Sequence, residues 1–217
     1  DLYSVSSETD LKLLSKNFKS RKNNIYLLRN WVQGPDSVQF KNREDRVISV
    51  GRLEYQKNFS YMLSEFQNTN YKLVIYGNGT KKNVLLRDSI KNKVNLELVD
   101  SIKNDDLIKV LNKSKYFILP SHFEGNPKSL LEAMSAGCIV LASNIENHKE
   151  IIEDGVDGFL FDLDEGSLFN KFENIKTFKE ENLSDISLAA TLKIKNHYSI
   201  EKIATEEKDL VLGLLNG

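Results

Sequence analysis

The segment LPSHFEGNPKSLLEAMSAG, residues 119–137, runs from the end of a buried strand into a capped helix. Residues 116–119 form a continuous apolar run, which is typical of a strand in a sheet with both faces buried. A loop then leads to a helix predicted to have Asn126 as its N-cap and Pro127 at its first position, where the missing N–H of proline is harmless. Gly137 is predicted to end this helix in a left-handed conformation. The segment therefore predicts one strand–loop–helix unit of an α/β fold.

The same unit recurs along the chain at intervals of 20 to 24 residues. The runs that predict strands start at Val47, Tyr71, Val94, Tyr116, Cys138 and Gly158. Between them lie stripes with helical spacing, such as Phe59, Met62, Leu63 and Phe66, and Asn104 is predicted to cap a further helix. Strands that alternate with helices predict a parallel sheet covered on both faces. We therefore expect a doubly wound, Rossmann-like α/β domain over residues 45–170.

The two ends of the chain do not follow this rhythm. Residues 7–10 predict a capped helix start, residues 25–28 a short strand, residues 33–36 a turn and residues 41–45 a charged linker. We expect residues 1–44 to be the remnant of a preceding N-terminal domain and its linker. Residues 171–217 are predicted to be C-terminal helices, the last with an apolar face. The first residue is not methionine, which indicates a fragment of a longer protein.

Composition limits the classes of function. The 217 residues include 30 basic and 31 acidic side chains, and the formal net charge of −1 gives no bulk attraction to nucleic acid. The single cysteine, Cys138, cannot form an internal disulfide and fits a small core residue. No apolar run approaches the roughly 20 residues needed to cross a membrane, and the N-terminus has no signal-peptide pattern.

Polar groups gather where the strand of the opening segment ends. The backbone amides of Lys128, Ser129 and Leu130 are predicted to be exposed at a helix N-terminus on the carboxyl edge of the sheet, where α/β folds bind phosphate. Glu124 precedes this helix and Glu132 lies on its second turn. Carboxylates beside a phosphate site can accept hydrogen bonds from sugar hydroxyls, so this combination predicts a nucleotide-sugar site.

A second cluster follows the strand that starts at Val47. Gly51 permits a tight turn or the close approach of a ligand. Arg52 and Lys57 place two cations at the same edge, where they would neutralise a diphosphate and stabilise its charge as it leaves. Residues 77–79, Gly-Asn-Gly, begin a dinucleotide-binding fingerprint, but Lys82 stands at its third glycine position, so this motif is weak.

These motifs, in this order and spacing, resemble the C-terminal domain of GT-B glycosyltransferases. The resemblance is to the retaining family-4 enzymes (glycosyl transferases group 1), whose E-x7-E motif is matched by Glu124 and Glu132. It covers roughly residues 1–165, and residues 5–7 and 28–30 resemble the end of that family's N-terminal domain. Most of that domain is missing here. Residues 125–128 read Gly-Asn-Pro-Lys where many relatives have Gly-Phe-Gly, so this loop departs from the family's pattern.

The resemblance implies a domain that binds a nucleoside-diphosphate sugar for transfer, with retention, to a saccharide or lipid-linked acceptor in cell-surface polysaccharide synthesis. Arg52 and Lys57 would hold the diphosphate, Glu132 the ribose and Glu124 the transferred sugar, and Glu124, Arg52 and Lys57 would be the catalytic residues. The residues implied in donor binding are Gly51, Arg52, Lys57, Glu124, Gly125, Asn126, Ser129, Leu130 and Glu132. The fragment by itself is expected to be inactive.

The resemblance also implies that no metal ion and no cofactor besides the nucleotide sugar is needed. The donor class and the lack of a signal imply a cytoplasmic protein, and any association with the inner face of the membrane would use the missing N-terminal domain. A non-catalytic donor-binding subunit of a split transferase is an alternative function. A nucleotide-sugar epimerase is a third, which the two-glutamate motif does not favour. The nucleotide base, the sugar and the acceptor are left open.

Overall fold

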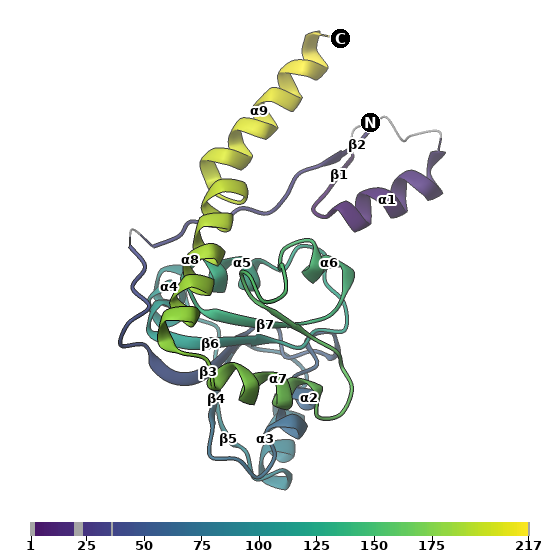
Figure 1. Cartoon of the computed structure of the whole chain (residues 1–217). Coiled ribbons are helices and arrows are strands. Elements are labelled where there is room, and N and C mark those ends of the chain that lie inside the picture. Colours follow the sequence, from purple (N-terminus) through teal and green to yellow (C-terminus); the bar gives the residue numbers. More distant parts are fainter. Residues whose placement is uncertain (1–2, 20–23, 36, 217) are drawn as a thin grey trace.

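A six-stranded parallel sheet forms the centre of the protein, and a separate two-stranded sheet lies near the N-terminus (Figure 1). The computed structural model describes residues 3–19, 24–35 and 37–216. The large sheet consists of β3 (Glu44–Val50), β4 (Lys72–Tyr76), β5 (Asn95–Val99), β6 (Ser114–Leu119), β7 (Ile139–Ser143) and β8 (Phe159–Phe161). All six strands expected from the sequence are present, and the α/β fold class is confirmed.

The strand order places two distant loops beside each other. The order in the sheet is β5-β4-β3-β6-β7-β8, and every pairing is parallel. The chain runs outward from β3 to β5 and then returns to β6, which pairs with β3 through Ile48 and Phe117. Loops leave β3 and β6 toward opposite faces of the sheet, so a crevice for ligands is expected at their carboxyl ends.

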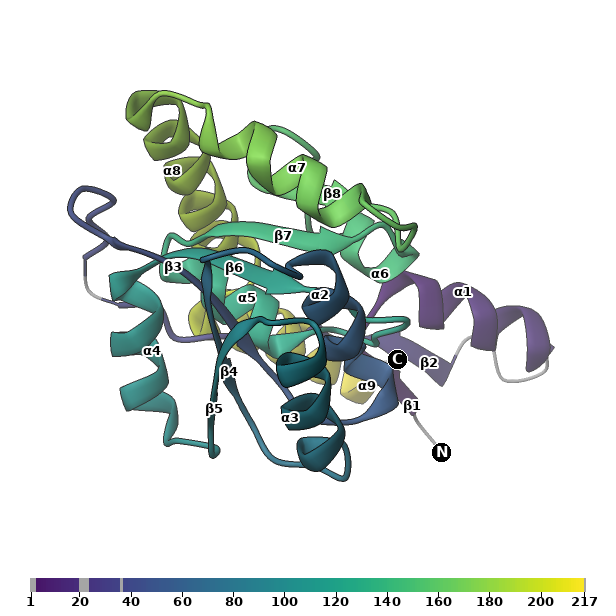
Figure 2. The same ribbon diagram turned by 90° about the horizontal axis from the view of Figure 1, so that it is seen from below.

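Helices cover both faces of the sheet (Figure 2). One face packs against α2 (Phe59–Glu65), α3 (Lys82–Lys91) and α7 (Ser167–Lys176), and the other against α4 (Asn104–Lys113) and α5 (Lys128–Ser135), while α8 (Glu180–His197) contributes residues to the apolar clusters on both faces. Successive strand residues alternate between the two apolar clusters, as Val47 and Ile48 do. This alternation explains why the strands read as continuous apolar runs.

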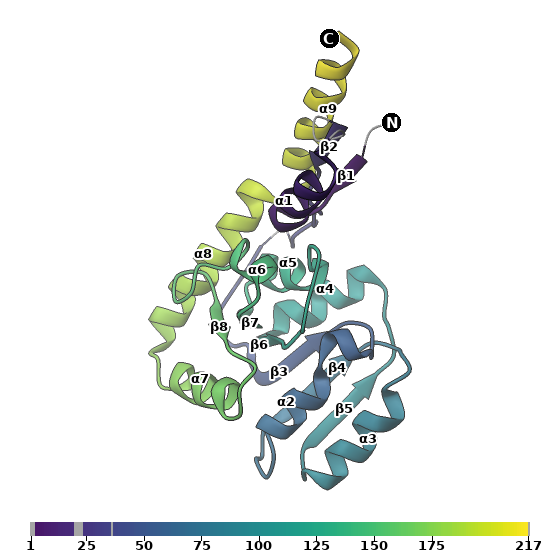
Figure 3. The ribbon, with the colours of Figure 1, turned by 90° about the vertical axis from the view of Figure 1, so that its right-hand side faces the viewer.

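A smaller unit precedes the large sheet in the chain. It consists of β1 (Tyr3–Val5) paired in parallel with β2 (Ile25–Leu27), joined by α1 (Glu8–Asn17). The hydroxyl of Ser7 accepts a hydrogen bond of 3.1 Å from the backbone N–H of Asp10, so the predicted cap of α1 is confirmed. This unit and the last helix, α9 (Ile200–Asn216), lie on the same side of the six-stranded region (Figures 1 and 3).

Several predicted boundaries differ from the structure. The prediction that Asn126 caps α5 is wrong: Pro127 takes the cap position, with an extended backbone, and Lys128 is the first helical residue. Asn104 is likewise the first residue of α4 rather than its cap. The charged segment expected as a linker enters β3 at Glu44, and residue 170, the expected end of the domain, lies within α7. Asp36, in the turn expected at residues 33–36, lies outside the described residues.

Candidate functional site

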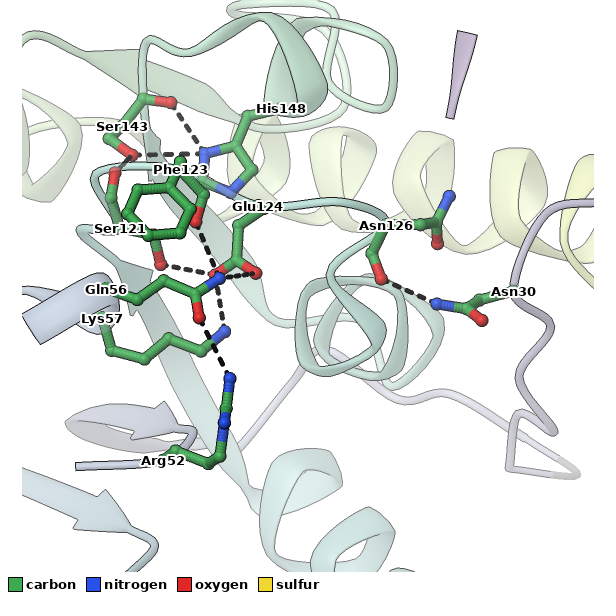
Figure 4. A network of polar contacts seen from close by, with 10 residues as sticks. All are labelled: Asn30, Arg52, Gln56, Lys57, Ser121, Phe123, Glu124, Asn126, Ser143 and His148. Atoms are coloured by element: carbon green, nitrogen blue, oxygen red, sulfur yellow. Dashed lines mark hydrogen bonds and ion pairs between the residues drawn. The ribbon is translucent and has the colours of Figure 1, made fainter. Parts of the chain in front are cut away.

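The two charged clusters of the sequence meet between the carboxyl ends of β3 and β6. Lys57 ends the short 3-10 helix η2 (Tyr55–Lys57), and Glu124 lies in the loop after β6. The Lys57 Nζ atom is 2.5 Å from Glu124 Oε1, and the two side chains are 11% and 7% exposed (Figure 4). A cation and a carboxylate separated by 67 positions therefore form a nearly buried ion pair at the crevice.

A glutamine that the sequence did not single out joins the two loops. Gln56 Nε2 donates hydrogen bonds to the Phe123 carbonyl at 2.9 Å and to Glu124 Oε2 at 3.3 Å. Its Oε1 accepts from Arg52 Nη2 at 3.1 Å, and its carbonyl accepts from the His122 N–H at 2.9 Å. Gln56 thus connects the exposed Arg52 to the Glu124 carboxylate, and these contacts hold the loops together (Figure 4).

Glycines shape the loop that carries Arg52. A Cβ added to Gly51 would stand 2.9 Å from Cε of Lys57. The absence of a side chain at Gly51 therefore allows the aliphatic part of Lys57 to pack against the turn. A Cβ on Gly77 would collide with the Gly51 carbonyl oxygen, and one on Gly79 with the backbone of Leu53. The Gly-Asn-Gly segment therefore packs against the Arg52 loop, which accounts for its glycines without a dinucleotide fingerprint.

The N-terminus of α5 offers fewer free amides than predicted. The Leu130 N–H donates to the Pro127 carbonyl at 3.0 Å, so the expectation that this amide is exposed is wrong. Lys128 and Ser129 precede the first intrahelical hydrogen bond, and their amides face the helix start. Asn126 is bound to the N-terminal segment instead: its Nδ2 donates to the Ser6 carbonyl at 2.9 Å, and its own carbonyl accepts from Asn30 Nδ2 at 2.7 Å.

Glu132 is buried in α5, one turn beyond the amides of the helix start. The residue is 6% exposed, and its carboxylate has no hydrogen bond to any residue that the structure describes. Burial raises the pKa of the Glu132 carboxyl, while the positive charge of Lys128 acts in the opposite direction. A buried carboxylate with unused acceptor oxygens is well suited to receive hydroxyl donors from a ligand.

A hollow of about 210 Å³ adjoins Arg52 at the carboxyl ends of β3 and β4. Its lining includes Val50, Tyr76, Ile102 and Leu107 together with the backbone of Gly51. The mixture of apolar side chains with loop backbone suits a flat, largely apolar group next to a charged one.

The loop that follows β7 ties the site to the N-terminal unit. Within it, α6 (Glu146–Lys149) carries Asn147, whose Nδ2 donates to the Gly125 carbonyl at 2.7 Å. Glu150 accepts hydrogen bonds from the backbone N–H groups of Glu8 at 2.9 Å and Thr9 at 2.7 Å, and from the Thr9 hydroxyl at 2.5 Å. Neither residue belongs to a recognisable spacing pattern, so only the structure reveals this role.

The fold and the site define an α/β domain with cations and carboxylates gathered at the switch point of a parallel sheet, which is where such sheets bind nucleotides. The chain belongs to the family described as glycosyl transferases group 1, whose sequence profile matches residues 34–180.

Curated relatives come from bacteria and from the archaeon Methanocaldococcus jannaschii. The chain is 30% identical over 177 residues to an Escherichia coli UDP-Gal:alpha-D-GlcNAc-diphosphoundecaprenol alpha-1,3-galactosyltransferase, a match that covers 76% of this chain and 45% of the relative. It is 32% identical over 123 residues to the capsular polysaccharide biosynthesis glycosyltransferase CapH of Staphylococcus aureus, covering 52% and 34% of the two chains. This chain thus corresponds to half or less of the length of these relatives.

Solved structures share the fold. A mutant of Staphylococcus aureus TarM, in complex with Fondaparinux, alpha-GlcNAc-glycerol and UDP, superposes with a TM-score of 0.79 at 21% identity over 95% of this chain and 43% of that one. Anabaena HepE, in complex with UDP and glucose, superposes with a TM-score of 0.81 at 14% identity over 97% and 62%. The fold is that of GT-B glycosyltransferases.

Among the residues that the structure describes, no three His, Cys, Asp or Glu side chains are grouped so that they could hold a metal ion. None of the described helices combines the length and the apolar character needed to cross a membrane.

Proposed function

We propose that this chain is the donor-binding half of a retaining glycosyltransferase. The enzyme would transfer a sugar from a nucleoside-diphosphate sugar to a saccharide or lipid-linked acceptor in polysaccharide synthesis. The observation that carries this proposal is the Lys57–Glu124 pair at the switch point, with Arg52 joined to it through Gln56 and Glu132 on the following helix. Family membership supports the reaction class, and the names of the E. coli and S. aureus relatives support the acceptor class.

Different residues would bind the different parts of the donor. The hollow beside Arg52 would take the base, and the Glu132 carboxylate would accept hydrogen bonds from the ribose hydroxyls. Arg52, Lys57 and the first amides of α5 would hold the diphosphate. In the structure Lys57 and Glu124 neutralise each other. A diphosphate gives Lys57 a more highly charged partner, which frees Glu124 to accept hydrogen bonds from hydroxyls of the donor sugar.

In the transfer step, the bond between the anomeric carbon and the diphosphate oxygen breaks, and the diphosphate leaves with the electron pair. Arg52 and Lys57 would stabilise the charge that develops on it. The acceptor hydroxyl bonds to the same face of the anomeric carbon and gives its proton to a leaving phosphate oxygen. Attack on that face retains the anomeric configuration, and no metal ion takes part.

Calorimetric titration with UDP, GDP and ADP and their common sugar conjugates tests the donor site. One nucleotide should bind selectively, and Arg52→Ala and Glu132→Ala should each weaken it by tenfold or more. Lys109→Ala serves as a matched control because Lys109 lies on the outer surface of α4 with its side chain 72% exposed. Failure of every nucleotide to bind at millimolar concentration, or equal weakening by the control, would contradict the proposal.

A further inference from the structure

A buried histidine lies close to the loop that carries Glu124 (Figure 4). His148, in α6, is fully buried, with its Nδ1 atom 2.8 Å from the Ser143 carbonyl and 3.3 Å from the Ser143 hydroxyl. Its Nε2 atom is buried as well and has no hydrogen-bond partner among the described residues. Burial lowers the pKa of His148 to about 4, so the ring is neutral near pH 7.

The carbonyl partner determines which ring nitrogen carries the proton. A carbonyl oxygen can only accept, so Nδ1 must be the protonated nitrogen and Nε2 the bare one. An Nδ1–H group also faces the Ser143 hydroxyl, which must then direct its own hydrogen elsewhere. That hydroxyl donates to the Ser121 carbonyl at 2.6 Å. The tautomer of His148 thereby sets the direction of the Ser143 hydrogen bond.

The chain of contacts ends on the site carboxylate. The Ser121 hydroxyl donates to Glu124 Oε1 at 2.6 Å, on the oxygen that also receives Lys57. From the same helix as His148, Asn147 holds the Gly125 carbonyl. Asn147 of α6 and Ser143 of β7, the residue that His148 contacts, therefore hold the Glu124 loop on the two sides of the carboxylate.

Stability alone does not account for an imidazole at this position. The Ser143 carbonyl already accepts a hydrogen bond of 2.8 Å from the Ile145 N–H, so it would remain satisfied without His148. The bare Nε2 is a buried acceptor without a donor, which is unfavourable for folding. An apolar side chain would avoid that penalty but would leave the Ser143 hydroxyl without its Nδ1–H neighbour.

We propose that His148 is a positioning residue that, through Ser143 and Ser121, holds the Glu124 carboxylate in the orientation that receives the sugar of the donor. This proposal rests on the donor site proposed above and deepens it. It assigns His148 to the sugar-dependent part of binding and not to the nucleotide-dependent part. Its effect should therefore appear in the difference between a nucleoside diphosphate and its sugar conjugate.

The test compares binding of the selected nucleoside diphosphate with that of its sugar conjugate by calorimetry. His148→Leu is expected to weaken binding of the sugar conjugate roughly tenfold, about 1.4 kcal/mol, and to change the affinity for the bare diphosphate by less than twofold. His148→Asn keeps a donor at the Nδ1 position and should restore most of the lost affinity. Ser143→Ala should reproduce the loss, which keeps the test decisive if His148→Leu fails to fold.

A matched control removes another buried hydrogen bond to the backbone, away from the site. Ser187→Ala deletes the hydroxyl that donates to the Gly137 carbonyl at 2.7 Å, and it should change neither affinity. Equal weakening of both ligands by His148→Leu, or no weakening of either, would overturn the positioning role while the nucleotide site stands. If neither ligand binds to the unaltered chain, the donor site itself is wrong and the role of His148 falls with it.

Discussion

The six-stranded region and the β1-α1-β2 unit are stabilised by different kinds of contact. The large sheet packs against helices through two apolar clusters, in which side chains such as Phe66, Phe117 and Phe172 are fully buried. In contrast, α1 has no buried residue, and a hollow of about 230 Å³ lies open among Tyr3, Leu14, Phe18 and Ile25.

The small unit is joined to the large region by polar contacts. Glu150 binds the start of α1, and Asn126 binds Ser6 and Asn30. Hydrogen bonds of this kind are directional but contribute less than the burial of an aromatic cluster. The large region should therefore determine the global stability of the chain, and the small unit should open locally while the sheet stays folded.

The largest expected effect is the loss of unfolding free energy when a buried aromatic side chain is removed from the large region. Phe172 lies edge-on to three rings, with centroids 5.1 Å from Phe66, 5.0 Å from Tyr71 and 5.1 Å from Tyr116. Phe172→Ala should lower the free energy of unfolding by about 3–5 kcal/mol. Phe18→Ala, at a residue 53% exposed in the small unit, should change it by less than about 0.5 kcal/mol. Urea unfolding measures both, and comparable losses would mean that the small unit has an apolar core of its own.

A second prediction concerns His148, the imidazole ring buried in the large region next to the site. Burial lowers the pKa of His148 from 6.5 to about 4. Between these two pH values His148 is therefore protonated in the unfolded chain and stays neutral in the folded chain. The contribution of neutral His148 to the free energy of unfolding is fully present above pH 6.5 and is lost as the pH falls to 4. The loss amounts to about 3 kcal/mol.

The measurement is the free energy of unfolding at pH 7 and at pH 4, for the unaltered chain and for His148→Asn. The variant should lack this part of the acid destabilisation. His197→Asn, which removes an exposed histidine at the end of α8, is the control. The same drop in stability in all three proteins would show that His148 is not kept neutral by burial.

Removing the hydrogen bonds of Glu150, which connect the large region to α1, should have an intermediate effect. Glu150→Ala removes a carboxylate that accepts from two backbone amides and one hydroxyl, so α1 should open more easily by about 2 kcal/mol. Hydrogen exchange at the amides of Glu8 and Thr9 measures this opening. Glu146→Ala is the matched control, since its carboxylate is exposed and pairs only with Lys149 among the described residues. A loss of protection that spreads to β6 and β7 would mean that the two regions unfold together.

The smallest effect is expected within the small unit. Ser7→Ala removes the cap of α1 and should reduce the protection of its first turn by about 1 kcal/mol without changing global stability. Ser15→Ala, in the same helix, should preserve or increase protection because alanine favours the helix. Protection factors from hydrogen exchange compare the two variants. An equal loss in both would show that capping does not limit the stability of α1.

Local patterns predicted most of the fold. The six strands were found because residues buried on both faces must be apolar along their whole length. The stop of α5 at Gly137 was found because its φ of 75° suits glycine. The start of the same helix is misplaced by one residue, because the contacts of Asn126 with Ser6 and Asn30 are invisible to local spacing.

The sequence by itself determined the α/β class, the approximate strands and helices, and the charged residues that follow β3 and β6. It also carried the family motif, because periodicity and turn chemistry act over a few neighbouring residues. The tertiary structure alone decided that Lys57 lies against Glu124, that Gln56 joins the two loops, and that His148 lies close to the Glu124 loop. These contacts depend on the order of strands in the sheet, which sets β6 beside β3 although β4 and β5 intervene in the chain.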